Sequence, residues 1–239
     1  MPPSQTLTLH NAAKFRDCLN VMAALCDSVT LKYDHRTKIL HAIVMDMSHV
    51  SLLQFTWKAV SCDSEEDFSI SFGFKHMSQA LQFAKTPDIF IGVEEDSIHL
   101  SMNDEQVNFR LKQIDIDDIE MNIDDFDHER IEIDRKEFAD LVKQYALISD
   151  SFEIEIADGQ ALITASGDIG DVKISYTTEA NTMRKQALST KFVISFMKTV
   201  SQRFHIQLAD QMPCVFAFDD DDFTLKFFLA PKIEDDMDT

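Results

Sequence analysis

Two Asp-rich stretches gather side chains that could bind a metal ion. They span Asp115–Asp127 and Asp219–Asp222. Carboxylate oxygens are the ligands that Ca²⁺ prefers, but the calcium loop of an EF-hand also needs a glycine at its sixth position and a glutamate at its twelfth. Neither stretch supplies both residues. We therefore expect two solvated loops here and no metal site in the chain.

Histidine, cysteine and glycine are the other residue types whose spacing can reveal an active site. The eight histidines form neither HExxH nor HxxxH, and His49 cannot form a triad with Asp46 and Ser48, because neighbours on an extended segment do not face one another. The four cysteines include no CxxC pair, so free thiols are expected. The five glycines form neither GxGxxG nor GxxxxGK. These patterns predict neither an enzyme nor a cofactor.

The charge of the chain is unevenly distributed. The chain holds 42 acidic and 22 basic residues, and its formal net charge of −20 argues at first against nucleic acid as a partner. Nine basic residues against three acidic ones nevertheless fall in the four segments with helical periodicity, which are 11–26, 75–85, 135–147 and 190–200. If these helices share one face, that face is basic and can meet phosphate groups. The alternative is an ordinary solvated helix surface.

A helix-forming pattern occurs twice in the chain, and strand patterns follow each copy. The helical spacing i, i+3, i+4, i+7 first joins four apolar residues, which are Phe15, Cys18, Leu19 and Met22. The same spacing recurs 123 residues later in Phe138, Leu141, Val142 and Tyr145. Each copy continues with alternating apolar residues, a second amphipathic helix and more alternating segments. Strands joined by short turns pair antiparallel, so the pattern predicts an α+β fold of two similar domains, each with two helices packed on antiparallel sheets.

The segment between the two copies, Gln113–Glu129, holds eight acidic and no basic side chains. Its apolar residues follow no sustained period, which is typical of a solvated linker; an irregular edge strand is the alternative for its first half. The predicted domains are therefore residues 1–112 and 130–239, joined by the linker 113–129. The chain has no signal-peptide pattern and no run of the ~20 apolar residues that span a bilayer, so we expect a soluble, intracellular protein without a membrane partner.

Four segments of the chain resemble proliferating cell nuclear antigen, the eukaryotic sliding clamp family. MDMSHVSL at residues 45–52 resembles the family segment D-x-S-H-V-S-L, and ASGDIG at residues 165–170 resembles its turn A-S-G-E-L-G. The helix around Phe138 resembles the start of the family's second domain. KFFLAPKIED at residues 226–235 resembles K-Y-Y-L-A-P-K-I-E-D. The matches occur in order over nearly the whole chain, which is typical of a divergent member, viral or from an unusual eukaryote.

The resemblance implies the DNA-clamp fold and a non-enzymatic DNA polymerase processivity factor. Members of the family are head-to-tail homotrimers that close into a ring around double-stranded DNA without reading its sequence. They tether DNA polymerases and other replication and repair proteins, are placed on DNA by a clamp loader, and act in the nucleus, or at the site of viral replication. The channel helices of the family match segments of this chain that carry Lys14, Arg16, Lys75, Lys85, Lys143, Lys191 and Lys198.

Two further surfaces are implied by the resemblance. A pocket on the front face of the family binds a partner motif with a glutamine, a hydrophobic residue and two aromatic residues, and the matching positions are Met45, His49, Val50, Leu52, Met121, Ile123, Pro213, Phe228, Leu229, Ala230, Pro231 and Ile233. Subunit contacts fall within Asn108–Gln113 and Asp171–Tyr176. The contact residues implied are Asn108, Phe109, Arg110 and Leu111, and on the neighbouring subunit Val172, Lys173, Ile174 and Ser175.

The chain also departs from the family. Gln79 and Gln82 stand where the family usually has lysines, as do Asp17 and Ala23 in the first helix, so we expect weak and salt-sensitive DNA contacts. No lysine occurs in Ala157–Gly159, near the position that eukaryotic clamps modify with ubiquitin.

Two other functions stay open beside the ring. The first is a clamp-fold protein that forms no ring and either binds DNA on one basic face or serves as a scaffold. The second is an Asp-rich mimic of DNA, which the segregation of basic residues onto the helices disfavours.

Overall fold

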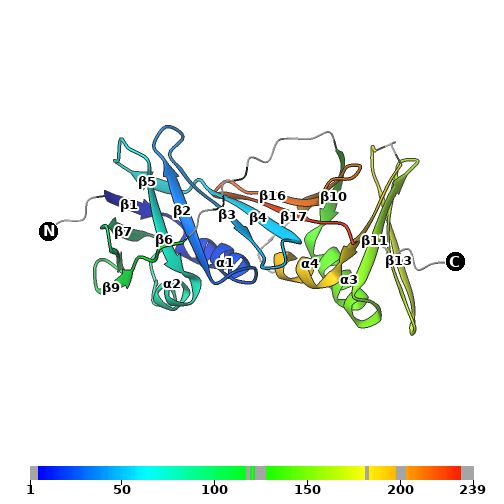
Figure 1. Cartoon of the computed structure of the whole chain (residues 1–239), viewed down its shortest axis with the longest axis horizontal. Helices are drawn as coiled ribbons and strands as arrows, with labels where there is room; N and C mark the ends of the chain where they lie inside the picture. The colour runs from blue at the N-terminus through cyan, green and yellow to red at the C-terminus, as the bar shows by residue number, and fades with distance from the viewer. Residues whose placement is uncertain are drawn as a thin grey trace. The chain divides into compact units, whose positions relative to one another are not determined.

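The computed structural model describes residues 5–116, 119, 121, 128–180, 183–197 and 203–232. The chain forms two compact units (Figure 1). The first unit comprises Met1–Asn122 together with Asp219–Leu225, and the second comprises Ile123–Phe218 together with Lys226–Thr239. Near its C-terminus the chain thus contributes a short segment to the first unit. No helix in the described ranges is long and apolar enough to span a membrane.

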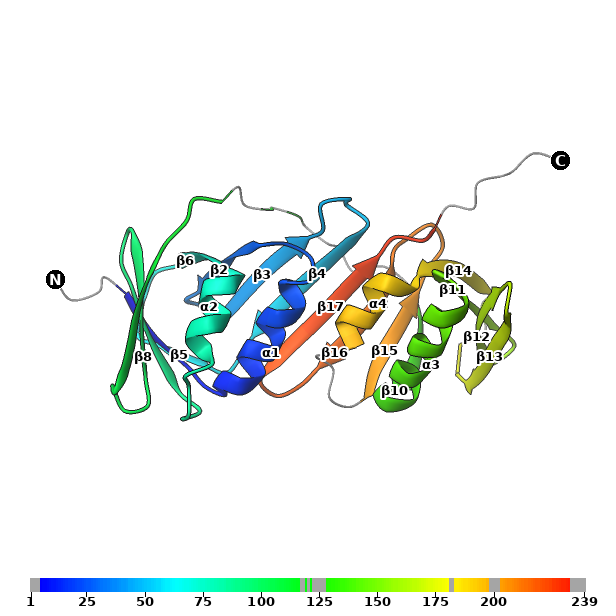
Figure 2. The ribbon, with the colours of Figure 1, turned by 90° about the horizontal axis from the view of Figure 1, so that it is seen from below.

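The first unit combines two antiparallel sheets with two helices. The strand orders are β5-β1-β7-β8-β9 and β4-β3-β2-β6. Helices α1 and α2 lie side by side on one face of the strands (Figure 2). The elements are β1 (Gln5–Leu9), α1 (Ala12–Met22), β2 (Ser28–Asp34), β3 (Ile39–Met45), β4 (Ser51–Trp57), β5 (Val60–Cys62), β6 (Phe68–Gly73), α2 (Phe74–Leu81), β7 (Ile89–Val93), β8 (Ser97–Met102) and β9 (Val107–Lys112).

The second unit repeats this plan. Its strand orders are β13-β12-β11-β14 and β10-β15-β16-β17, and α3 and α4 again lie side by side (Figure 2). The elements are β10 (Glu129–Asp134), α3 (Arg135–Ile148), β11 (Ser151–Ala157), β12 (Gln160–Gly167), β13 (Gly170–Thr177), β14 (Arg184–Ser189), α4 (Thr190–Met197), β15 (Arg203–Leu208), β16 (Cys214–Asp219) and β17 (Phe223–Leu229). The predicted α+β fold of two similar domains is confirmed.

The repeat extends to the two cores. Phe15 and Phe138 stand at equivalent places on α1 and α3, and both are fully buried. The Phe15 ring meets the edge of Trp57 at 5.1 Å between centroids, and the Phe138 ring lies 5.4 Å from Phe204. Such aromatic pairs add stability beyond the apolar area that they bury. The helical spacing therefore marks the face that each helix turns to its core, apart from the half-buried Leu141.

Two helix ends differ from the prediction. The spacing predicts helices over 11–26 and 75–85, whereas α1 ends at Met22 and α2 ends at Leu81. Lys85 lies instead in a loop, where its backbone N–H and that of Thr86 donate to Asn103 Oδ1 at 2.6 and 3.2 Å. Apolar spacing reports burial, and a loop that packs on the core can continue the spacing past the last helical turn.

A glycine of the ASGDIG turn allows β12 to pass close to the end of α3. A Cβ built on Gly167 would lie 2.2 Å from the carbonyl oxygen of Ile148, which is backbone and has little room to move. We expect Gly167→Ala to lower the free energy of unfolding by about 1–3 kcal/mol, the usual cost of an extra methyl group in a packed site. Gly73→Ala is the matched control, because its Cβ would meet no atom closer than 3.9 Å. Equal thermal midpoints for the two variants would contradict this assignment.

Asp46 shapes the loop within the MDMSHVSL segment. Its side chain is only 8% exposed and accepts hydrogen bonds from the backbone N–H groups of Ser48, Val50 and Ser51 and from both serine hydroxyls. Burial opposes the charge of Asp46, but the bonds from Ser48 and Ser51 outweigh it and hold the pKa of the carboxyl below its usual range. The loop is thereby fixed, with His49 exposed and in a left-handed conformation (φ 57°).

Candidate nucleic-acid interface

The helices are the basic elements of both units. The four described helices hold seven Lys and Arg residues and three Asp and Glu residues. This is fewer basic residues than predicted, because Lys85 lies beyond α2 and Lys198 lies outside the described residues. Within each unit the basic side chains stand on two neighbouring helices, so a single polyanion could contact both helices of a unit.

In the second unit, basic side chains surround a shallow hollow between α3 and α4. The hollow has a volume of about 210 Å³ and an apolar floor, and it is lined by Arg135, Lys136, Ala139, Asp140, Val142, Lys143, Ile194 and Met197. The Lys143 side chain is 70% exposed, and its Nζ lies 3.2 Å from Asp140 Oδ1. Lys191 is exposed on the first turn of α4. Exposed surface ion pairs are weak, so Lys143 is available to a phosphate group. Lys136, which is one of the nine basic residues of the helical segments but is not assigned to DNA by the family match, is exposed on the same rim.

Arg135 has a positioning role in this hollow. Its guanidinium Nε and Nη2 donate to the carbonyl oxygen of Met197, the last residue of α4, at 3.1 and 3.0 Å. Helix ends leave such carbonyl groups without a partner inside the helix. At the start of α3, the Asp134 side chain accepts from the N–H groups of Lys136 and Glu137. Arg135 thus joins the start of α3 to the end of α4 and fixes the hollow between them.

In the first unit, Lys14 is already bound to carboxylates. Its Nζ lies 2.9 Å from Asp220 Oδ1 and 2.8 Å from Asp222 Oδ2. Its hydrogen bonds to these two residues raise the pKa of the Lys14 ammonium group to about 12. The other predicted contacts of this unit differ: Arg16 Nε lies 4.0 Å from Asp17 Oδ1, and Lys75 and Lys85 are exposed.

Asp219–Asp222 lead through a loop from β16 to β17, as expected, but three of the four carboxylates bind neighbouring side chains. Asp219 Oδ1 accepts from Lys58 Nζ at 2.6 Å, and Asp222 Oδ2 accepts from Asn11 Nδ2 at 2.7 Å. With Lys14, two lysine ammonium groups thus lie against the carboxylates of this stretch. Asn11 stands at the N-cap position of α1, as its residue type predicts, but its side chain makes this contact instead of a capping bond. Most of the other Asp-rich stretch lies outside the described residues.

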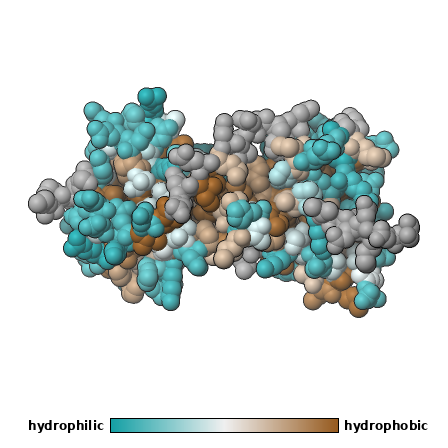
Figure 3. Space-filling view, viewed as in Figure 1, coloured by the Kyte–Doolittle hydropathy of each residue, from teal (hydrophilic) through white to brown (hydrophobic). Residues whose placement is uncertain are grey.

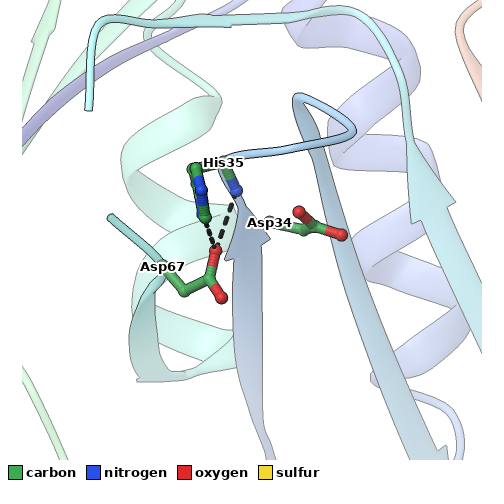
Figure 4. A group of neighbouring side chains, drawn as sticks. All are labelled: Asp34, His35 and Asp67. Atoms are coloured by element: carbon green, nitrogen blue, oxygen red, sulfur yellow. Dashed lines mark hydrogen bonds and ion pairs between the residues drawn. The ribbon is translucent and has the colours of Figure 1, made fainter. Parts of the chain in front are cut away.

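One group of side chains in the described part of the chain has the composition of a metal site. Asp34, His35 and Asp67 place a ligand atom each within 4.8 Å of one another. His35 Nδ1 and the His35 backbone nitrogen lie 2.6 and 2.9 Å from Asp67 Oδ1, while the Asp34 carboxylate points away from this pair (Figure 4). Asp34 Oδ1 accepts from the backbone N–H groups of Arg36 and Thr37. These hydrogen bonds give the three side chains a structural role. Asp34 stabilises the β2–β3 turn, and Asp67 binds the turn at His35.

The positions matched to the partner-peptide pocket differ in exposure. Leu229 is fully buried in the core, so we no longer expect it to touch a peptide, and Leu52 and Phe228 are only 7% and 8% exposed. Met121 and His49 are exposed. Five others are half-buried, namely Met45, Val50, Pro213, Ala230 and Pro231. Ile123 and Ile233 lie outside the described residues.

The strands matched to the subunit contacts are both edge strands. β9 carries Asn108, Phe109, Arg110 and Leu111 and ends the first sheet, while β13 carries Val172, Lys173, Ile174 and Ser175 and ends the third. Large apolar side chains that sequence reasoning missed lie close to both edges. Phe83 is 56% exposed with its ring 5.5 Å from that of Phe109. Leu147, near the end of α3, and Ile169, between β12 and β13, are 78% and 76% exposed. Figure 3 shows that the visible face of the molecule carries brown, hydrophobic surface among the teal.

The comparisons with known proteins agree with this arrangement. A sequence model of the family described as Proliferating cell nuclear antigen, C-terminal domain, matches residues 122–233. The Proliferating cell nuclear antigen of Caenorhabditis elegans is 27% identical, over 90% of this chain and 93% of the worm protein. The Probable DNA polymerase sliding clamp 2 of Paramecium bursaria Chlorella virus 1 is 29% identical, over 81% of this chain and 78% of the viral protein.

A solved structure extends the likeness to the fold. The proliferating cellular nuclear antigen of Entamoeba histolytica superposes with a TM-score of 0.86 at 19% identity, over 97% of this chain and 100% of that protein. Three findings point to the same family: the order of strands and helices in each unit, the matched family segment and the near full-length relatives. Residues 122–233 thus match the C-terminal domain of proliferating cell nuclear antigen, and the findings together support a divergent clamp of that type.

Proposed function

We propose that the protein is a DNA polymerase processivity factor that works as a closed ring of three subunits around duplex DNA. The observation that carries the proposal is the pair of edge strands β9 and β13. An unpaired edge strand exposes a row of N–H and C=O groups, which makes it a template for another strand. A head-to-tail contact that joins β9 of one subunit to β13 of the next covers both edges, and such contacts form a ring when the rotation closes.

The internal repeat supports this pairing. In the order of the repeat, β13 is the counterpart of β4, and β9 is the counterpart of β17. The two edge strands thus hold different places in one repeated plan, which suits a head-to-tail contact between different units of two chains. Three chains with two repeats each would then give six similar units.

The charge pattern suits a ring better than a one-sided DNA-binding protein. Basic helices on a chain of net charge −20 can make weak, sequence-independent contacts to phosphate groups, while the acidic remainder repels DNA elsewhere. A ring needs no strong contact, since its retention is topological. A polymerase bound to the ring stays at a high effective concentration near its template. The ring makes and breaks no bond, so the proposed function needs neither a catalytic residue nor a cofactor.

Polymerases, a clamp loader and other proteins with the aromatic partner motif are the proposed partners. The proposal is supported by the printed name of the viral relative, which is a probable DNA polymerase sliding clamp. The relatives come from eukaryotes and from a virus, which supports a nucleus or a viral replication site as the place of action. The second candidate is a clamp-fold protein that forms no ring, and it keeps the basic helices but leaves β9 and β13 unpaired.

Light scattering on the purified protein separates the two candidates. A ring should give a mass three times 27.3 kDa, independent of concentration over the range in which the subunits stay associated. A stable mass of 27.3 kDa at micromolar concentration would favour the candidate without a ring.

A further inference from the structure

Lys14 is held more tightly than the other described basic residues that the family match assigns to DNA. Two carboxylates, one each from Asp220 and Asp222, lie within 3 Å of its ammonium group, at 2.9 and 2.8 Å. The Lys14 side chain is 41% exposed, while those of Asp220 and Asp222 are only 17% and 25% exposed. Lys14 is separated in the sequence from Asp220 by 206 positions and from Asp222 by 208 positions.

The turn that carries these carboxylates is itself firmly attached to the first unit. The backbone carbonyl of Asp222 accepts from the N–H groups of Lys58 and Ala59 at 2.7 and 3.2 Å. The Asp222 N–H donates to Asp220 Oδ1 at 3.2 Å, which fixes one carboxylate relative to the other. Next to the turn, the Phe223 ring stacks on Trp57 at 5.7 Å. The two carboxylates are therefore already in position, and binding Lys14 requires no large rearrangement.

A DNA phosphate would compete with this turn at a disadvantage. Both partners offer anionic oxygen atoms to an ammonium group, so the two interactions are of the same chemical kind. The carboxylates belong to the same molecule and are held near Lys14, which gives them a high effective concentration. A single exposed ion pair would contribute little, but here two acceptors, also held by Asn11 and the Lys58 backbone, act together.

We propose that the Asp219–Asp222 turn occupies Lys14 in place of a DNA phosphate, so that each subunit approaches DNA with one available cation fewer. The inference rests on the proposed function, because it concerns the grip of the ring on DNA. The turn thereby limits the number of contacts that the ring makes to DNA phosphates. Each contact to a phosphate group must break before the ring can move along the duplex, so it adds to the barrier for sliding. A ring with fewer such contacts should slide more freely.

A double-mutant cycle tests the proposal. Lys14→Met is made in the native chain and in the variant Asp220→Asn/Asp222→Asn, and binding to a short fluorescent duplex is measured by anisotropy over a series of salt concentrations. We expect Lys14→Met to cost much more affinity in the Asn background, where Lys14 is released. There the salt slope should also fall by about 0.9 for the phosphate contact that is lost. Melting curves of every variant show that the chain stays folded.

Arg16→Met on the same helix is the matched control, since Arg16 makes no contact with the turn in the described structure. Its effect should be equal in both backgrounds. Equal effects of Lys14→Met in the two backgrounds, whether large or absent, would overturn the proposal, because additivity means that the turn does not compete for Lys14. Failure of the proposed function would look different: the mass would then be that of one subunit, whatever the outcome of the double-mutant cycle.

Discussion

Aspartate in place of both Leu147 and Ile169 should convert the ring into single subunits of 27.3 kDa. Both side chains are more than three-quarters exposed in the isolated chain, so the folded subunit should accept the change. They lie at the end of α3 and in the β12–β13 turn, next to the edge that we expect the neighbouring subunit to cover. A carboxylate buried there without a partner costs several kcal/mol of association free energy. Light scattering measures the mass directly.

Met183→Asp is the matched control for this prediction. Met183 is 70% exposed, but it precedes β14, which is the opposite edge of the same sheet. The control should keep the mass of the ring. Loss of the ring in the control as well, or a ring that persists in the Leu147→Asp/Ile169→Asp variant, would show that β13 is not the subunit edge.

Charge reversal at Lys136 and Lys143 should produce the second large effect, a loss of duplex binding with the ring intact. The two residues stand on the rim of the hollow between α3 and α4. Contacts to phosphate groups release counterions, so the logarithm of the affinity falls with the logarithm of the salt concentration by about 0.9 per contact. Lys136→Glu/Lys143→Glu should reduce this slope by about that amount for each contact removed. Anisotropy titrations with a short duplex at several salt concentrations measure the slope.

Arg36→Glu/Lys38→Glu is the control of equal charge. These two residues lie in the β2–β3 turn and are exposed, but they belong to no helix. Their reversal should lower the affinity only through the net charge and should leave the slope nearly unchanged. An equal loss of slope in both variants would show that the helices are not the DNA-binding face.

The sequence predicts the elements of this fold well, because the buried face of a helix or strand places apolar residues at regular intervals in the sequence. The alternating apolar residues Val29, Leu31 and Tyr33 lie buried in β2, as a half-buried strand requires. The ends of helices are harder to predict. Ala84 continues the i, i+3, i+4, i+7 spacing of Met77, Ala80 and Leu81, although it belongs to the loop after α2.

Contacts between distant residues leave no local trace in the sequence. The spacing around Lys14 indicates an exposed basic residue on a helix, and the run Asp219–Asp222 indicates a solvated loop. The fold brings Lys14 next to this run, where its ammonium group pairs with the carboxylates of Asp220 and Asp222. The exposed Leu147 and Ile169 were missed for a related reason. Neither residue fits a periodic pattern, and only the sheet order shows that they lie near an edge strand.

Retention on circular DNA tests the central claim most directly. The labelled protein is placed on a nicked circular duplex with a eukaryotic-type clamp loader and ATP, and the DNA-bound fraction is separated by gel filtration before and after one restriction cut. A ring that encircles DNA should stay on the circle and leave through the free ends once the circle is cut. Equal retention on circular and cut DNA would contradict the account, because it would mean that the protein holds DNA by contact and not by topology.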